Sequence, residues 1–147
     1  MFGALMAGHK AAAVAPTWPS INGDIIPGSL FRDRPLRLNF IDNTTTIHFM
    51  HRMLAYSLLL LICIWSVMVY RFRKIPDYLR KVRWMPLAFV IFQVLLGIAV
   101  VLSSPGIVVN RWVFFDWVAQ FHQIIGMLLL LVMIYMLYIV RPTYTRA

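Results

Sequence analysis

The sequence predicts an all-α fold, a polytopic membrane bundle with three full transmembrane helices. Of its 147 residues, 61% are hydrophobic, a larger share than a soluble domain of this size carries. Three uncharged runs, at 53–70, 84–110 and 117–140, stand out along the chain. Each run approaches or exceeds the roughly 20 residues that a helix needs to cross about 30 Å of hydrocarbon. The chain therefore belongs in a lipid bilayer.

The segments follow in order as a single membrane domain. Residues 1–8 form a short hydrophobic stub, without the basic segment and long apolar core of a secretory signal. Residues 9–46 are punctuated by four prolines and two glycines, which predicts an outer loop. The polar cluster at 42–46 offers N-caps to the helix that follows. The predicted helices span 47–71, 84–104 and 115–140, with Pro86 tolerated in a first turn, and 141–147 form a cytoplasmic tail.

The distribution of basic residues predicts the orientation of the chain. The 71–83 connector and the tail carry an excess of seven positive charges, against two for the segments expected on the opposite side. Short loops rich in Lys and Arg stay on the cytoplasmic side. We therefore expect the connector and tail on the cytoplasmic side of the membrane and the 9–46 loop on the outer side. The first and third spans then run in the same direction.

Composition also excludes some classes of function. The net charge of +9 does not indicate nucleic-acid binding, because the basic residues flank apolar runs and do not line a polar face. Cys63 is the single cysteine, so the chain has no intramolecular disulfide, thiolate metal cluster or CxxCH attachment.

Two histidines lie inside or at the edge of predicted spans, where an ionisable side chain is costly and usually functional. His51 precedes the inner boundary at Arg71 by 20 residues, and His122 precedes Arg141 by 19. At about 1.5 Å per residue, both lie roughly 30 Å from that boundary. Because their helices run in the same direction, the two histidines can face each other and ligate one heme iron from both sides.

Small residues accompany the pair and leave room for a flat porphyrin. Ala55 and Gly126 each lie one turn deeper than a histidine on the same face. On the middle helix, Gln93 and Gly97 share one stripe, and such small positions allow close approach. Arg52 follows His51 at the outer interface, where it can pair with a heme propionate.

Each residue also has an ordinary interpretation. His51 is compatible with a helix-entry residue at the headgroup region, and His122 with a bond to a neighbouring backbone group or to Gln123. The small residues are compatible with plain helix packing. His9 and His48 are more typical of solvated or capping residues than of ligands. The matched depth of His51 and His122 is what favours a shared ligand.

Five stretches, in order and register, resemble the C-terminal half of the heme A synthase family. They are 3–8 (GALMAG), 17–19 (TWP) with Pro27 after it, 49–56 (FMHRMLAY), 93–99 (QVLLGIA) and 121–123 (FHQ). The resemblance implies half of an eight-helix fold in a bacterial inner membrane, in which residues 1–8 end a truncated helix. It implies that one half of the family oxidises heme O, and that the other half holds a heme b that passes electrons.

The sequence departs from that family pattern in two ways. In the substrate half a glutamate stands three residues before the HR histidine, whereas His48 stands at that position here and the sequence has no Glu. This departure favours the electron-carrying half and leaves the chain without that carboxylate. The short N-terminus also implies a fragment, a start assigned too late, or a partner that supplies the missing helix.

The leading hypothesis is therefore a heme A synthase-type oxidoreductase for cytochrome oxidase assembly. This chain would be its heme b half, and catalysis would require an N-terminal half or another membrane subunit. Two alternatives remain open. The chain could be a small b-type cytochrome or respiratory-complex subunit without synthase activity, or a structural membrane subunit without heme.

Overall fold

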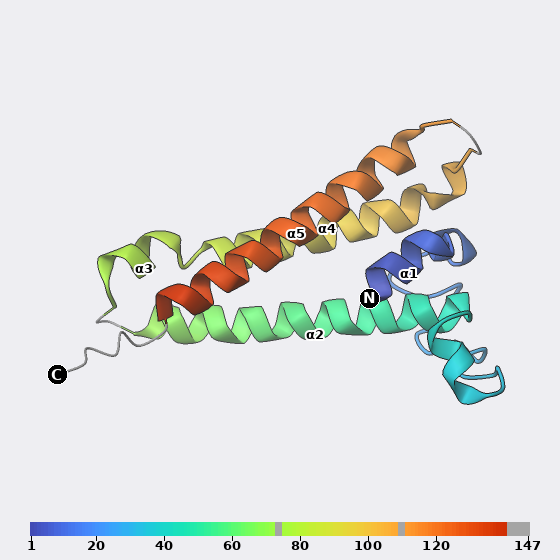
Figure 1. Cartoon of the computed structure of the whole chain (residues 1–147), viewed down its shortest axis with the longest axis horizontal. Helices are drawn as coiled ribbons and strands as arrows, with labels where there is room; N and C mark the ends of the chain where they lie inside the picture. The colour runs from blue at the N-terminus through green and yellow to red at the C-terminus, as the bar shows by residue number, and fades with distance from the viewer. Residues whose placement is uncertain (73–74, 109–110, 141–147) are drawn as a thin grey trace.

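The computed structural model describes residues 1–72, 75–108 and 111–140. Within these ranges the fold is helical, and the sole strand-like feature is an isolated bridge between Ile21 and Asp24. Three segments are long and apolar enough to cross a membrane, namely Thr44–Arg71, Asp77–Gly106 and Phe114–Val140. The predicted fold class is thus confirmed, and the chain is a multi-pass membrane protein (Figure 1). The predicted tail, and Arg73 and Lys74 of the connector, lie outside the described residues.

The first long helix, α2, spans Thr44–Arg71 and begins three residues before its predicted start at 47. The side chain of Asn43 accepts a hydrogen bond from the backbone N–H of Thr46, so the polar cluster does supply the N-cap. The threonines at 44–46 form the first turn of the helix rather than the end of the loop. At the other end Arg71 lies in the last turn, where a positive charge interacts favourably with the helix dipole.

The connector after α2 contains a helix that the sequence analysis did not predict. Helix α3 spans Asp77–Val82, with Asp77 in its first turn and Arg80 paired to it in its last. These charges complement the helix dipole at both ends. Helix α4 spans Met85–Ser103, with proline in its first turn as predicted, and ends in the 3-10 turn η3 at Ser104–Gly106.

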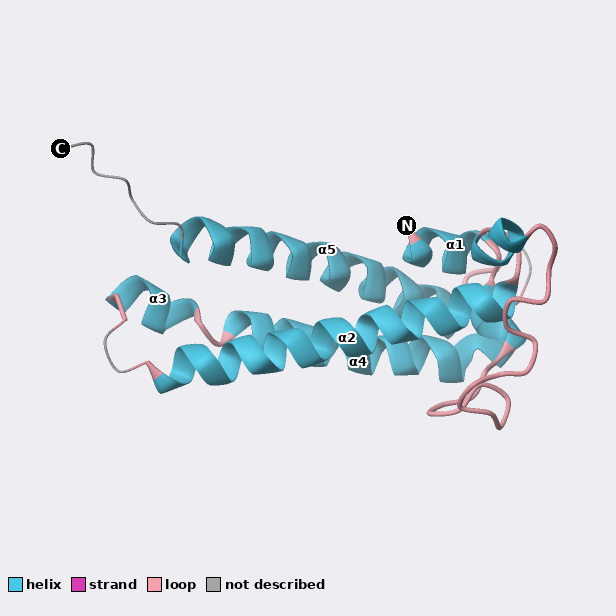
Figure 2. Ribbon diagram, turned by 90° about the horizontal axis from the view of Figure 1, so that it is seen from below, coloured by secondary structure: helices cyan, strands magenta, loops and turns pink. Residues whose placement is uncertain are grey.

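The last helix, α5, spans Phe114–Val140 and packs along α4 in the most extensive helix contact of the bundle. α2 and α5 run in the same direction, and α4 runs antiparallel to both, back toward the end at which α2 and α5 begin (Figures 1 and 2). A buried cluster of Ile62, Val90 and Leu129 joins one residue from each long helix. Elsewhere large apolar side chains such as Leu60 and Leu137 are exposed, as expected for surfaces that face lipid tails.

The N-terminal helix α1, Phe2–Gly8, lies against α2 at the end of the bundle that carries the 9–43 segment (Figure 1). We call this the loop end. The 9–43 segment contains two 3-10 turns, η1 at Ala11–Val14 and η2 at Leu36–Phe40. Ser104 at the end of α4 donates a hydrogen bond to the carbonyl of Ala12 at 3.0 Å. The loop end is therefore tied to the long helices through buried polar contacts.

Candidate functional site

His51 on α2 and His122 on α5 lie close together toward the loop end of the bundle. Their ring centroids are 6.3 Å apart, and their planes stand at 79° to each other. The parallel course of α2 and α5 brings the two residues to one level, as their distances from the helix ends predicted. Helix α1 flanks the pair, because a Cβ built on Gly3 would lie 3.8 Å from Cε1 of His51.

This spacing suits two ligands of one metal. Two imidazoles that bind a metal from opposite sides, with metal–nitrogen bonds of about 2 Å, hold their ring centres roughly 6 Å apart. Among the described residues, no group of three or more His, Cys, Asp or Glu side chains could hold a metal ion. A bare ion would be left short of ligands here, whereas a porphyrin brings its own in-plane nitrogens. The residues present therefore fit heme better than a free ion.

Gln93 on α4 is the polar neighbour of His122. The side-chain nitrogen Nε2 of Gln93 lies 3.3 Å from Nε2 of the imidazole. In the described part of the protein, Oε1 of Gln93 and Nδ1 of His122 are buried without a hydrogen-bond partner. Buried polar atoms are rarely left unpaired, so this pair of side chains has bonding capacity that the protein itself does not use. Gln123, which the sequence offered as a partner for His122, is exposed.

The two glycines of the site receive side chains from the opposite helix. A Cβ on Gly97 would lie 3.1 Å from Cε1 of His122, and one on Gly126 would lie 3.0 Å from Nε2 of Gln93. The predicted small positions exist, but the structure fills them with the imidazole and the amide rather than leaving an open slot. Ala55 lies one turn deeper than His51 on α2 and is half-buried.

Arg52 does not project freely from the bundle but is 7% exposed and holds the loop. Its Nη1 donates to the carbonyls of Pro19 and Ser20 at 3.2 and 3.0 Å, and its Nη2 donates to that of Thr17 at 2.7 Å. Nε donates to Nε2 of His48 at 3.0 Å. Four of the five guanidinium N–H groups are thus engaged. The predicted propionate contact for Arg52 stays a prediction, with one donor left to make it.

The interpretation of His48 as a solvated or capping residue is wrong. Its side chain is 1% exposed, and its Nε2 accepts the hydrogen bond from Arg52. The burial arises because the loop folds back over this turn of α2, which a local reading of the sequence does not reveal. His9, in contrast, is exposed beside α1.

Comparisons with known proteins identify the family of this chain. The family model described as "Cytochrome oxidase assembly protein" (COX15-CtaA) matches residues 1–134. The chain belongs to this family. Similar relatives are named heme A synthase: that of Brucella suis is 39% identical over 103 residues, which are 69% of this chain and 28% of the relative. Those of Brucella ovis and Brucella anthropi are 38% and 36% identical over the same shares.

The chain therefore spans little more than a quarter of the length of these COX15-CtaA relatives. No solved structure matches it significantly. Membership of this family relates the chain to proteins described as cytochrome oxidase assembly proteins, and the names of its relatives concern heme A.

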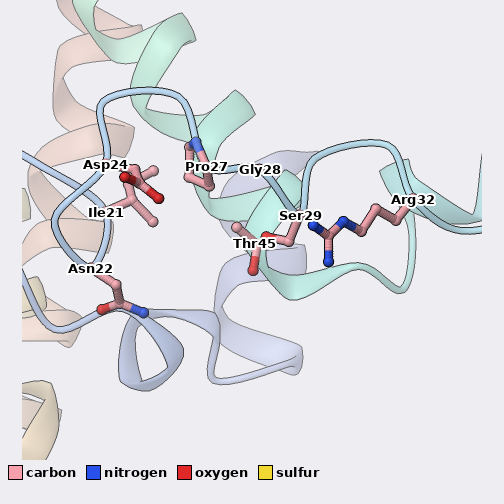
Figure 3. Close-up of a pocket in the computed structure, with 8 residues that line it drawn as sticks. All are labelled: Ile21, Asn22, Asp24, Pro27, Gly28, Ser29, Arg32 and Thr45. Atoms are coloured by element: carbon pink, nitrogen blue, oxygen red, sulfur yellow. The ribbon is translucent and has the colours of Figure 1, made fainter.

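A separate pocket of about 330 Å³ lies in the 9–43 segment of this family member (Figure 3). Arg32 extends along it toward Ser29 and Thr45, while Asn22 and Asp24 line its other side. No histidine is among the lining residues. This pocket is thus distinct from the histidine site, and its polar lining is open to solvent.

Proposed function

We propose that this chain holds a b-type heme between His51 and His122. The observation that supports the proposal is the 6.3 Å separation of two imidazoles that come from opposite halves of the sequence. The buried Nδ1 of His122 supports it as well, because this nitrogen has no partner in the described part of the protein and is left to bind iron, while Gln93 holds the ring at Nε2.

The residues around the pair have separate roles in this proposal. Gln93 positions the ring of His122, and Gly97 leaves the space that the ring occupies. Ala55 and Gly126 are proposed as small neighbours of the cofactor. Arg52 fixes the loop beside His51 and keeps one donor for a propionate. The bound iron supplies one-electron transfer, and the protein supplies ligation, burial and orientation.

At the level of the whole protein, we propose a heme A synthase-type oxidoreductase that makes heme A from heme O for cytochrome oxidase. The names of the relatives support this assignment. The present chain contributes the electron-carrying part, and an N-terminal half or another membrane subunit contributes the substrate site. We also propose a bacterial inner membrane as the location, since the relatives are bacterial proteins. The charge distribution supports an orientation with the loop end outside and the α3 connector in the cytoplasm.

The test is a heme titration of the purified chain in detergent, followed by optical and electron paramagnetic resonance spectroscopy. The native protein is expected to bind one heme in a low-spin form, and His51→Ala and His122→Ala are expected to lose that form. His9→Ala is the matched control, because His9 is an exposed histidine at the same end of the bundle. A low-spin spectrum that survives His122→Ala refutes the ligand assignment.

A second candidate is a small b-type cytochrome without synthase activity. The pairing of His48 with Arg52 favours it, because the position that carries a glutamate in the family's substrate half is here occupied in holding a loop. Co-expression with the substrate half of a relative separates the two candidates. Conversion of heme O to heme A that depends on His122 supports the synthase, and heme binding without conversion supports the cytochrome.

A further inference from the structure

A second pocket, of about 440 Å³, lies at the loop end between the start of η1 and the start of α5. Lys10, Arg111 and Asp116 contribute its charged groups, and Trp112 and Phe115 are its aromatic walls. Lys10 is the residue before η1, two residues after the end of α1, whereas the other four belong to the segment that enters α5. Two distant parts of the chain thus converge on one cavity.

The side chains that line this pocket carry a net positive charge. Oδ2 of Asp116 accepts the backbone N–H of Val113 at 2.8 Å, so the carboxylate is already engaged in capping α5. In the described ranges neither Lys10 nor Arg111 forms an ion pair. With Lys10 and Arg111 against Asp116, the pocket has an excess of one positive charge, and a ligand with anionic groups could form strong charge-assisted hydrogen bonds to the two cations.

The position of the pocket connects it with the histidine pair. Phe115 precedes His122 by seven residues, which places both on one face of α5 about 10 Å apart along the helix axis. Lys10 follows the helix whose Gly3 lies against His51. The pocket therefore continues the histidine site toward the loop end. A porphyrin carries both of its carboxylates on one edge, several ångströms from the metal.

We infer that Lys10 and Arg111 bind the two propionate carboxylates of the porphyrin whose iron His51 and His122 hold. The inference rests on the proposed function. In the described ranges these two cations form no ion pair, whereas the guanidinium of Arg52 is largely taken by loop carbonyls and could add only one further hydrogen bond to a propionate. Trp112 and Phe115 border the porphyrin edge between the carboxylates and the ring.

The experiment compares two porphyrins in one binding assay. The purified chain is titrated with iron protoporphyrin and with its dimethyl ester, which keeps the ring and iron but has no anionic group. The native chain is expected to bind the ester at least tenfold more weakly, as two lost charged contacts imply. Lys10→Gln combined with Arg111→Gln is expected to weaken binding of the free acid by the same factor and to leave ester binding unchanged.

Two sets of variants control for folding. Lys10→Arg with Arg111→Lys keeps the charges and is expected to keep native affinity for the free acid. Arg37→Gln removes an exposed cation elsewhere in the loop and is also expected to keep native affinity. Equal weakening of acid and ester binding in the double Gln variant, or no weakening of either, overturns the inference. If no low-spin heme forms in the native chain, the proposed function fails. If low-spin heme forms without dependence on Lys10 and Arg111, the inference alone fails.

A phospholipid headgroup carries anionic chemistry similar to that of a propionate, and a parallel measurement separates the two. The melting temperature of the heme-free chain is recorded in nanodiscs with and without phosphatidylglycerol. Propionate binding predicts that the double Gln variant responds to this lipid as the native chain does. A lipid-dependent stabilisation that the variant loses, together with unchanged porphyrin affinities, assigns the pocket to lipid and overturns the inference.

Discussion

Substitution of Gly97 by alanine tests the contact on which the geometry of His122 depends. The added Cβ would lie 3.1 Å from Cε1 of His122, whereas ordinary carbon contacts are about 3.5 to 4.0 Å. The ring must therefore retreat by roughly half an ångström or less. It cannot do so without changing its 6.3 Å spacing from His51 or its contact with Gln93.

The energetic consequence follows from two opposing effects. Overpacking costs about 1 to 3 kcal/mol, and replacing a helical glycine with alanine returns about 0.5 to 1 kcal/mol. The heme-free protein should therefore lose between about 0 and 2.5 kcal/mol of unfolding free energy. Heme affinity should fall about tenfold, the equivalent of about 1.4 kcal/mol, because the displaced ring is the ligand. Heme titration with spectroscopy measures the affinity, and thermal unfolding in detergent measures the stability.

Alanine substitutions at two other glycines provide comparisons for the effect of Gly97→Ala on heme binding. A Cβ on Gly126 would meet the end of the flexible Gln93 side chain, which can turn away, so Gly126→Ala should weaken heme binding less. A Cβ on Gly8 would meet nothing within 4 Å, so Gly8→Ala should leave heme binding unchanged. Equal heme affinities for Gly97→Ala and Gly8→Ala would refute the placement of His122 against α4.

Three further substitutions test how the loop end is held. Arg52→Lys replaces a fork that reaches three loop carbonyls with a single ammonium group, so limited proteolysis of the 9–43 segment should accelerate, while Arg37→Lys should not change it. Ser104→Ala removes the hydrogen bond to Ala12 and should cost about 1 kcal/mol of unfolding free energy. Asn43→Ala removes the N-cap of α2 and should cost about 1 kcal/mol, measured by the same thermal unfolding in detergent.

Local patterns predicted much of the fold because the membrane imposes simple constraints. An uncharged run of about 20 residues must satisfy its backbone internally and so forms a helix, which located α2, α4 and α5. The level of His51 and His122 followed from counting residues to the helix ends. The start of α2 was missed by three residues, because threonines are compatible with both a loop and a first turn.

The parts that sequence analysis missed depend on contacts between distant residues. The partners of Arg52 in the loop lie 32 to 35 residues away, and no local pattern specifies the course of a loop that folds back on its helix. The proximity of Gln93 and His122 likewise depends on the rotation of α4 against α5. Helix α3 carried a usable signal, since a proline, an acidic first turn and basic residues at 80–81 are typical of a short capped helix.

The residue at position 48 bears on what the chain can contribute to catalysis. Nε2 of His48 accepts a hydrogen bond from Arg52, so this nitrogen presents a lone pair to a permanent cation and its proton must sit on Nδ1. The His48 side chain is fixed in this way and is 1% exposed. It supports Arg52, whose guanidinium holds the loop at residues 17–20. A carboxylate at the same position would form a buried ion pair with Arg52. Substitution His48→Glu should therefore hold Arg52 more firmly against loop residues 17–20 without creating a catalytic acid. An assay that found heme O oxidation by His48→Glu alone would contradict this reasoning.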